Sequence, residues 1–582
     1  MAPTFSLVTE PWINVWDLNT GESRDVGMGE ALTRAHRLRL TTHHPENVAA
    51  LRTLAAAFDA ACGPSTTAEW DAAWKAPTLD TAALDAYWER WADRLDLFHP
   101  EHPAFQCGQL TEYNRGPEAL HPGTLAGEAG PWFNHELYKP LPPWAPSRAA
   151  QLLLHLLTYD VAGIKRAAPG DPAGRGSKVY GSSIGPVAAS THLHLDLMGG
   201  TLKDVLLLNL PPQPRAAGDA PVWERPTPPA PMRERAATGR LDLLTWPNRR
   251  IRLHPQDDGT VDAVAHHDGD RLPNTWGPTH ALDPMTIWLN GDDGSSPMRL
   301  FNAQGWPEPW QAAQALAAPP TGLKVTSAAI THTIAAAERG TLDPDQSVNA
   351  SVGSVAHSNR HRSTISDIAV STAPMGTVGQ WADPEARTSL AAMVRYAGLI
   401  NSRLLKHAVR VSRLPADRIR GRLTLMNLEG PWREAVHTSA TDMSAARARW
   451  DQAVHEDAET NIGSLPLTPL TEAELLTVYR TDPTPKKDKP QRRRATAPAP
   501  AAPAAPRAKR GPRAERYEVF GGQYTLAELS RHPDCAVSYP TLAKRVKDED
   551  WDVTTAATTP ARGVRATPGA GTPRPAGDSD GS

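Results

Sequence analysis

Apolar side chains recur every three or four residues along several long stretches of this chain, which is the spacing that places them on one face of an α-helix. The clearest stretch covers residues 386–411, where Leu390, Met393, Val394 and Ala397 begin a continuous apolar face. Other stretches with this spacing are residues 45–62, 81–97, 147–163, 431–457 and 471–480. Because the last of these follow one another closely, the sequence predicts a helical bundle towards its C-terminal side.

A different pattern opens the chain. Between residues 5 and 16 apolar and polar residues alternate, as in a strand, with an interruption at Pro11 and turn-forming residues soon afterwards. Residues 201–210 are apolar and predict a buried helix. Residues 241–253 predict a pair of strands around a turn, with its arginines on a half-solvated sheet edge. This mixture predicts the α+β class.

At 582 residues the chain is too long for one ordinary core, and its composition predicts five segments. Residues 1–370 form an irregular α+β N-terminal domain, and residues 371–482 form the C-terminal helical bundle. Residues 483–516 are rich in proline, alanine and basic residues, the composition of a disordered linker. Residues 517–562 predict a small helix-turn-helix-like module, and residues 563–582 predict a disordered tail.

Charge is distributed unevenly along the chain. Between Lys486 and Arg516 there are eleven Lys and Arg residues and two acidic ones, a local balance of +9. Since the net charge is −3, the rest of the chain carries −12 (−3 minus 9), so any contact with a polyanion is expected to be local.

The same sequence bears on location and cofactors. There is no apolar run of membrane-spanning length and no leader-like segment, and the three cysteines are far apart. We therefore expect a cytoplasmic protein with no membrane contact, no disulfide framework and no cysteine-based zinc site. His99, Glu101 and His102 lie close together, but two interleaved prolines prevent a helical ligand face, and neither a metal nor another cofactor is predicted.

Residues 351–366 are the stretch with the clearest functional character. They contain His357, Arg360, His361 and Arg362, five serines and no acidic residue. The flanking chain is predicted to be helical, so this segment is expected to be a hairpin or tight loop on a rigid support. Such a tip could contact phosphates and base edges of a duplex, and a solvated basic loop is the alternative.

A second basic segment follows Gly163 and contains Lys165, Arg166, Arg175 and Lys178 among glycines. It lacks the Gly-x-x-x-x-Gly-Lys-Ser/Thr pattern of a nucleotide-triphosphate site. Contact between this basic glycine loop and a phosphodiester backbone is the interpretation that is left.

In the predicted C-terminal module, a short helix and a turn precede a second helix. Thr541, Lys544, Arg545 and Lys547 are expected to face outward from this second helix, as in a DNA-reading helix. Docking to another protein is the alternative.

Several segments in order resemble the large subunit of the type I-E CRISPR surveillance complex Cascade, the CasA family. They cover about residues 5–480 and leave out the C-terminal module. The segments are Phe5-x-Leu-x-x-x-Pro-Trp-Ile-x-Val15, His102-Pro-Ala-Phe-Gln106, Phe133-Asn134, the region from Gly163, residues 201–210 and Leu244-Thr-Trp246.

The resemblance implies a non-catalytic subunit that recognises the protospacer-adjacent motif (PAM) in target double-stranded DNA and starts strand separation. It also implies partners: other Cascade subunits, guide RNA, and a helicase-nuclease that this subunit recruits. The resemblance places a wedge under the PAM at Asn359, Arg360, His361, Arg362 and Ser363. It places a glycine-loop DNA contact at Gly163, Lys165 and Arg166. It also implies that a loop with Phe133, Asn134 and His135 contacts the end of the guide RNA and a neighbouring subunit.

The sequence departs from the family pattern at two points. The best-known wedge uses a glutamine where this chain has His361 or Arg362, and a cysteine cluster of some members is missing here. Two rival functions remain: a nuclease or other hydrolase, and a DNA-binding regulator acting through the C-terminal module.

Overall fold

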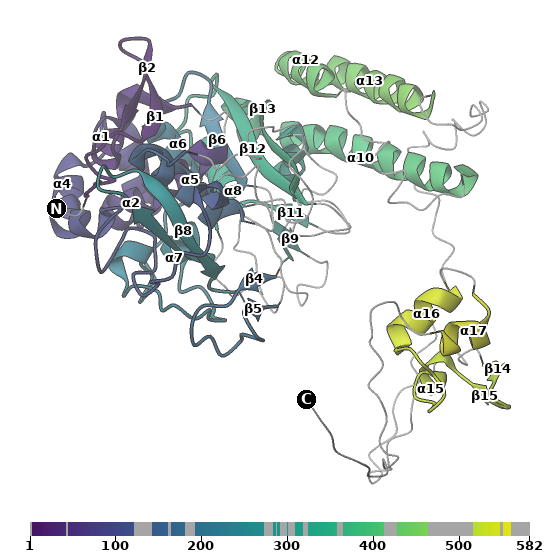
Figure 1. The fold of residues 1–582 in the computed structure, drawn as a ribbon. Coiled ribbons are helices and arrows are strands. Elements are labelled where there is room, and N and C mark those ends of the chain that lie inside the picture. The colour runs from purple at the N-terminus through teal and green to yellow at the C-terminus, as the bar shows by residue number, and fades with distance from the viewer. Residues whose placement is uncertain are drawn as a thin grey trace, which may run out of the picture. The chain divides into compact units, whose positions relative to one another are not determined.

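The computed structural model describes residues 3–41, 45–120, 142–160, 164–180, 192–272, 283–286, 288–290, 299–300, 309–317, 324–357, 365–412, 428–463, 516–547 and 551–559. The chain divides into two compact units, Met1–Pro483 and Thr484–Ser582 (Figure 1). The predicted helix at 471–480, nearly all of the predicted linker and the predicted tail lie outside the described residues.

The first unit mixes helices and strands, which confirms the α+β class. Its α-helices are α1 (Met28–Thr33), α2 (Pro45–Cys62), α3 (Thr67–Lys75), α4 (Thr81–Trp91), α5 (Pro146–Tyr159), α6 (Leu202–Asn209), α7 (Arg240–Leu244), α8 (Ala328–Glu338), α9 (Val378–Ala382), α10 (Pro384–Ser412), α12 (Glu429–Ser439) and α13 (Met443–Gly463).

The strands of this unit form small separate sheets. Antiparallel sheets have the orders β2-β1-β3, β13-β12-β6 and β10-β9-β11, with the pairs β4-β5 and β7-β8 beside them. The strands are β1 (Ile13–Asp17), β2 (Glu22–Val26), β3 (Leu38–Leu40), β4 (Lys165–Arg166), β5 (Lys178–Val179), β6 (His192–Leu197), β7 (Arg249–Pro255), β8 (Val261–Asp268), β9 (Trp288–Asn290), β10 (Arg299–Leu300), β11 (Lys324–Thr326), β12 (Ser347–His357) and β13 (Ile365–Thr377).

The opening hairpin agrees with the sequence pattern. Ile13 and Val15 point into the core from β1, and the chain turns at Gly21, whose φ of +72° is a conformation that glycine adopts without strain. The helices α2, α4, α6 and α10 also confirm the predicted spacing. Helix α6 begins with a capping box in which Thr201 and Asp204 each accept a hydrogen bond from the other's backbone N–H.

One local expectation was wrong. Residues 241–253 do not form a strand pair, because the first half is the helix α7 and only the second half is a strand, β7. The side chain of Asp219 accepts hydrogen bonds from the backbone N–H groups of Leu241 and Asp242, which stabilises the first turn of α7. Tertiary contact thus overrides the local strand preference.

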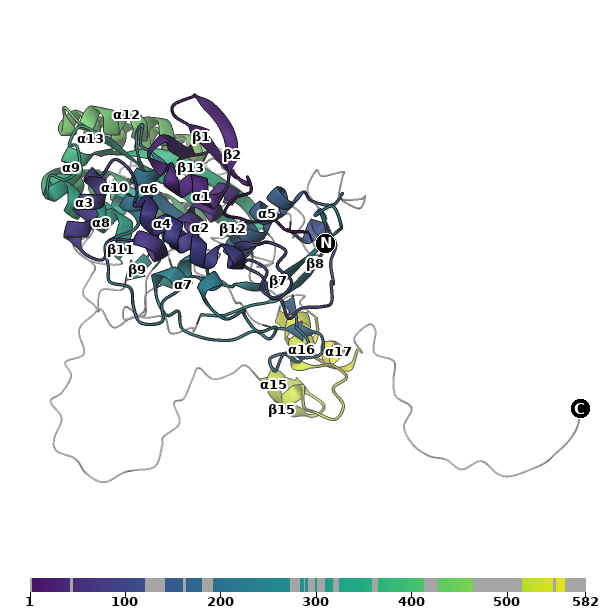
Figure 2. The ribbon, with the colours of Figure 1, turned by 90° about the vertical axis from the view of Figure 1, so that its left-hand side faces the viewer.

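One core joins the mixed part of this unit to its C-terminal helices. Trp310, Trp432 and Trp450 pack with ring centroids 5.2–6.0 Å apart, and the indole N–H of Trp450 donates to the carbonyl of Met393 in α10 at 2.7 Å. Figure 2 shows α8, α9, α10, α12 and α13 gathered on one side of the unit. Strand β13 runs through residue 370, so the helical region begins with α9.

The second unit has its own small core. A hairpin of β14 (Tyr517–Val519) and β15 (Gly522–Tyr524) precedes α15 (Leu526–Leu529), α16 (Tyr539–Lys547) and α17 (Val553–Thr558). The core consists of Val519, Leu526, Leu529, Val537, Leu542, Ala556 and Ala557. The two helices and intervening turn predicted from the sequence are present, and the hairpin and α17 are additions to that prediction.

Candidate nucleic-acid interface

The strands on either side of the predicted wedge form a long antiparallel hairpin. β12 and β13 are paired from Ser347↔Thr377 to His357↔Ile365, and residues 358–364 connect them. The expected hairpin is therefore confirmed, but the expected helical flanks were wrong. Alternating valines and small residues suit a strand, and β6, about 155 residues away in sequence, supplies the second pairing edge. Asn359, Arg360, His361, Arg362 and Ser363 themselves lie outside the described residues.

The C-terminal helices hold the base of this hairpin through hydrogen bonds to its backbone. The indole N–H groups of Trp432 and Trp381 donate to the carbonyls of Pro374 and Met375 at 2.7 and 2.8 Å. Arg433 of α12 donates to the carbonyl of Thr372 at 2.7 Å. Because β13 is paired on one side and bonded to two helices at its end, the hairpin is a rigid support for the segment that it carries.

A second, shorter hairpin carries exposed basic residues. β4 and β5 pair through Lys165↔Val179 and Arg166↔Lys178. The side chains of Arg166, Arg175 and Lys178 are exposed, as is Tyr180. This arrangement of cations beside an aromatic ring is suited to a phosphodiester backbone. Gly163, the first residue of the predicted glycine-loop contact, lies outside the described residues, as do Phe133, Asn134 and His135.

Lys165 has an internal role that sequence reasoning missed. Its ammonium lies 2.8–3.0 Å from the carboxylate oxygens of Asp160, which also pairs with Arg249 and accepts a hydrogen bond from Nε2 of His266 at 3.2 Å. Burial opposes ionisation of Asp160, but Lys165 and Arg249 hold its pKa well below the usual range. Burial lowers the pKa of His266 to about 4. Lys165 therefore anchors the β4–β5 hairpin, and Arg166 is the exposed member of the predicted pair.

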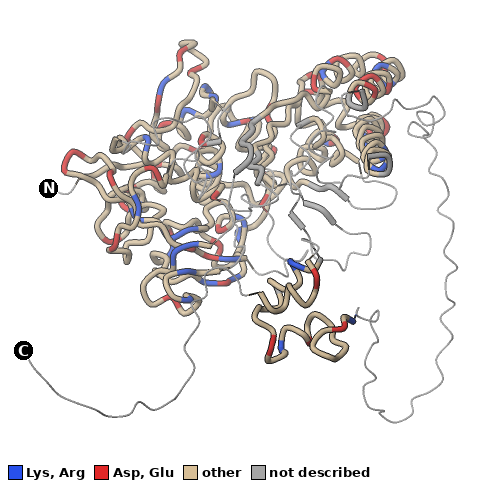
Figure 3. Tube along the Cα trace, turned by 45° about the vertical axis from the view of Figure 1, so that its right-hand side comes forward, with Lys and Arg blue, Asp and Glu red and all other residues tan. Residues whose placement is uncertain are grey.

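Two of the three arginines of β7 are also internal, so the expected half-solvated edge was wrong for Arg250, whereas Arg252 is half-buried. Arg249 and Arg250 are each 1% exposed. Arg250 pairs with Asp270, which also pairs with Arg233 and Arg235. Such arginines can be buried because carboxylates from distant parts of the chain neutralise them. Figure 3 shows basic and acidic positions interspersed along the described trace.

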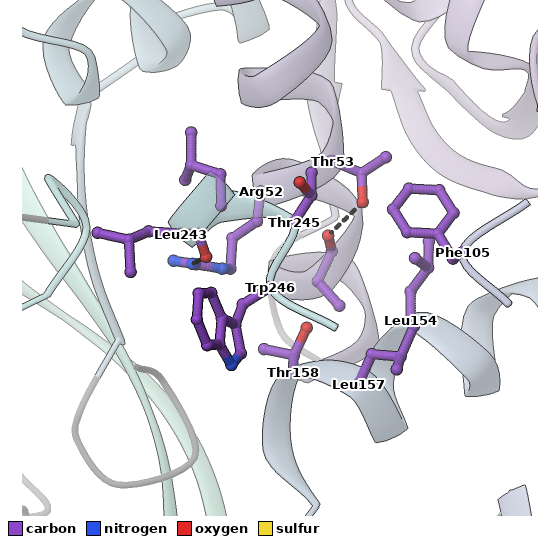
Figure 4. Close-up of a pocket in the computed structure, with 11 residues that line it drawn as sticks. Arg52, Thr53, Phe105, Leu154, Leu157, Thr158, Leu243, Thr245 and Trp246 are labelled. Atoms are coloured by element: carbon purple, nitrogen blue, oxygen red, sulfur yellow. Dashed lines mark hydrogen bonds between the residues drawn. The ribbon is translucent and has the colours of Figure 1, made fainter. Parts of the chain in front are cut away.

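A small cavity between α2, α5 and the end of α7 is too small for an organic ligand. Its volume is about 30 Å³, which is room for a few water molecules at most. Figure 4 shows Arg52 directed towards Leu243, whose carbonyl accepts its hydrogen bond at 3.0 Å. Arg52 also pairs with Asp283 at 2.6 Å, so this arginine is structural.

The two histidines of the loop at residues 99–102 form hydrogen bonds within the protein. His99 accepts from the backbone N–H of His102 at 2.9 Å, and His102 contacts Thr227 at 2.7 Å. Within the part of the chain that the structure describes, no group of three or more His, Cys, Asp or Glu side chains is placed to hold a metal ion. None of the described helices has the length and apolar character needed to cross a bilayer.

In the second unit, one of the predicted outward residues faces inward. Arg545 is 9% exposed, donates to the carbonyls of Ala556 and Thr559, and lies with its guanidinium carbon 4.8 Å from the ring centre of Trp551. The expectation for Arg545 was therefore wrong, because this side chain ties α17 to α16. Lys544 is exposed and Thr541 is half-buried, whereas the side chain of Lys547 lies outside the described residues.

Residues 6–460 match the model of the family described as CRISPR-associated protein Cse1. A curated protein of Thermus thermophilus, "CRISPR-associated protein CasA/Cse1", is 35% identical over 271 residues, which cover 44% of this chain and 50% of that protein. The chain thus spans about half the length of the curated relative that it matches.

Solved structures show the same fold. Cse1 of Thermobifida fusca superimposes with a TM-score of 0.64 at 24% identity, covering 79% of this chain and 92% of that one. A chain from a structure described as "CRISPR RNA-guided surveillance complex" has a TM-score of 0.60 at 20% identity and covers 82% of this chain and 98% of that one. At these identities the likeness is one of fold.

Proposed function

The chain belongs to the Cse1 family of CRISPR-associated proteins, and from this premise we propose that it is the non-catalytic large subunit of a type I-E Cascade complex. In this role it recognises the PAM in target double-stranded DNA, nucleates strand separation and R-loop formation, and recruits the helicase-nuclease. Its other partners are the remaining Cascade subunits and the guide RNA. Phe133, Asn134 and His135 are assigned to the contact with the guide end and a neighbouring subunit.

The observation that carries this proposal is the β12–β13 hairpin. Its strands stay paired up to His357↔Ile365, and the helices hold its base. The basic residues Arg360, His361 and Arg362 connect the two strand ends. A short basic segment on a rigid stem is what a wedge requires, because a flexible support would absorb the force needed to separate bases.

The energetics of R-loop formation explain why a wedge is sufficient. Exchanging a DNA duplex for an RNA–DNA heteroduplex is nearly neutral, with stacking of about 1.4 kcal/mol per step on each side. The unfavourable step is the first one, since unstacking a base step costs a few kcal/mol. The protein therefore needs to supply nucleation and register, and bond cleavage is left to the helicase-nuclease.

The β4–β5 hairpin supports the proposal with phosphate contacts. Arg166, Arg175 and Lys178 are exposed on this hairpin. Each neutralised phosphate releases condensed counterions and strengthens binding at low salt. Lys165 contributes indirectly, because its ion pair with Asp160 holds the hairpin in place.

The proposal is tested by assembling the complex with and without this chain and scoring R-loop formation across a library of PAM sequences. We expect R-loops on a restricted set of sequences only when the chain is present. If the complete library is opened equally well by the complex that lacks it, the proposal is wrong. The rival hypothesis of a nuclease is tested by incubating the isolated chain with PAM-bearing DNA and Mg²⁺. Cleavage of the DNA would support the nuclease.

A second candidate function is a DNA-binding regulator that acts through the C-terminal module. The observation in its favour is that this module forms a separate compact unit with its own core and an exposed Lys544 on α16. Under this alternative the large first unit serves for assembly, and the module reads DNA.

Removing residues 484–582 distinguishes the two candidates. We expect the truncated chain to support PAM-dependent R-loop formation, with a loss of affinity that is largest at low salt and shrinks as salt rises, because the basic segment from Lys486 to Arg516 is gone. DNA binding is measured by titration at several salt concentrations. Complete loss of DNA binding at low salt would favour the regulator instead. A chain in which only the basic residues of 486–516 are replaced by serine is the matched control.

A further inference from the structure

The edge strand β6 has an unusual polar face. Its sequence alternates strictly, so its leucines join the core on one face, while His192, His194 and Asp196 share the other. The two histidines are 0% and 1% exposed, and among the described residues neither ring nitrogen of either histidine has a hydrogen-bond partner. Since an unpaired buried polar group is costly, it calls for a partner that the described part of the chain does not supply.

A hollow of about 250 Å³ opens beside this polar face. Four strands from three distant parts of the sequence contribute polar residues to it, and α6 supplies part of an apolar wall. The residues that matter for its chemistry are Arg39 of β3, His194 and Asp196 of β6, Asn349 of β12, Thr372 of β13 and Val205 of α6.

The polar groups of the hollow are held in fixed positions. Asp196 accepts from the side-chain amide of Asn349 at 3.0 Å and from the hydroxyl of Ser351 at 3.4 Å. The hydroxyls of Ser351 and Thr372 lie 2.7 Å apart. Arg39 donates twice to the carbonyl of Gly200, at 2.7 and 2.9 Å. A carboxylate has about four acceptor sites, so Asp196 can accept further hydrogen bonds from a ligand.

This combination of groups selects among ligand classes. An anion is recognised by donors, and a metal ion by acceptors. The hollow instead offers both: a carboxylate that accepts, and a neutral imidazole with one donor and one acceptor nitrogen. A ligand with a flat apolar face and a mixed donor–acceptor edge is the complement, and a nucleobase has these properties.

A stacking surface adjoins Arg39, one of the residues that line the hollow. Trp16 is directly opposite Arg39 in the pairing of β1 with β3, and it is 44% exposed. Met198, which lines the hollow, is 64% exposed. An exposed aromatic ring beside a cation is the arrangement on which successive bases of a single strand stack.

We propose that this hollow receives one unpaired nucleobase of a single DNA strand, with Asp196 and His194 bonding to its polar edge and Trp16 stacking on a neighbouring base. The choice of DNA rests on the proposed function, in which a single strand is displaced. Asn349 precedes the strand end at His357 by eight residues, about 26 Å at 3.3 Å per residue. The base held here is therefore distinct from the step opened at the hairpin tip.

The test measures binding of labelled single-stranded 12-mers to the complete chain. The 12-mers carry each base in turn, and one carries abasic sugars on the same phosphate backbone. We expect the abasic strand to bind about 10-fold more weakly than the best base-containing strand. Asp196→Asn and Trp16→Ala are each expected to reduce that preference about 5- to 10-fold. Tyr113→Ala, which removes another exposed aromatic ring, is the matched control and is expected to bind as the unmodified chain does.

The outcomes separate the possible explanations. Equal binding of abasic and base-containing strands, or unchanged binding by both variants, would overturn the inference. Because Trp16 is exposed, Trp16→Ala keeps the test valid even if Asp196→Asn fails to fold. Free deoxynucleoside monophosphates are tested by equilibrium dialysis, and their binding without any binding of 12-mers would overturn a DNA strand as the occupant. PAM-dependent R-loop formation is scored in parallel, so a normal R-loop with no base preference rejects this inference alone.

Discussion

Replacing Arg360, His361 and Arg362 together by serine is expected to slow PAM-dependent R-loop formation by about 100-fold, with assembly of the complex unchanged. These residues connect the ends of β12 and β13, so the substitution removes the proposed wedge and leaves the paired strands intact. Unstacking the first base step costs a few kcal/mol, and the wedge is proposed to offset this cost. If the variant loses about 2.7 kcal/mol of that stabilisation, the rate falls by a factor of about 100. Stopped-flow measurement of strand opening on PAM-bearing duplexes gives the rate directly.

Two controls make this experiment specific. A duplex that already contains an unpaired bubble next to the PAM should be opened by the variant nearly as fast as by the unmodified complex, because nucleation is no longer required. Serine at Arg339 and Arg449, which form ion pairs near the surface, removes similar charge elsewhere and should leave the rate unchanged. If the triple variant opens intact duplex at the normal rate, the wedge lies elsewhere in the chain.

Arg249→Leu is expected to lower the free energy of unfolding of the first unit by about 3–5 kcal/mol. Arg249 is fully buried and pairs with Asp160 and Asp268, so its loss leaves carboxylates without their main partner. Lys165 then remains as the cation beside Asp160. The change is read from the urea midpoint and slope of the complete chain, followed by tryptophan fluorescence.

The matched control for this substitution is Arg449→Leu. Arg449 pairs with Glu434 at 2.9 Å, but both side chains are more than half exposed, so we expect a change below about 1 kcal/mol. Similar destabilisation by the two variants would contradict the distinction drawn between a buried structural network and surface pairs.

Much of the local structure could be predicted from the sequence, since it depends on neighbouring residues. Helix α10 follows from apolar spacing, and the β1–β2 hairpin follows from alternation and a turn that ends at Gly21. Helix α6 follows from its apolar run, and its Thr201 cap adds a local start signal. The resemblance to the CasA family was also in the residues, and the match over residues 6–460 confirms it.

The fate of individual charged residues could not be predicted in this way. Lys165, Arg250 and Arg545 each looked like a surface cation in sequence, and each is bonded internally. The position of Arg250 in a strand, next to apolar residues, is the one signal in the sequence that could have indicated its burial. Its partner Asp270 follows β8, and only the pairing of β7 with β8 brings the two residues together.

The sequence by itself determined the α+β class, the main helices, the separate C-terminal module and the family, because these depend on periodicity and motif order. Only the tertiary structure decided that the segment proposed as a wedge is carried by strands, that Arg249 and Arg250 are buried, and that His194 and Asp196 share a hollow with Arg39. The physical reason is that a polar group's environment is set by the partners that the fold brings to it. Those partners come from parts of the chain that are 20 to 161 residues away in sequence.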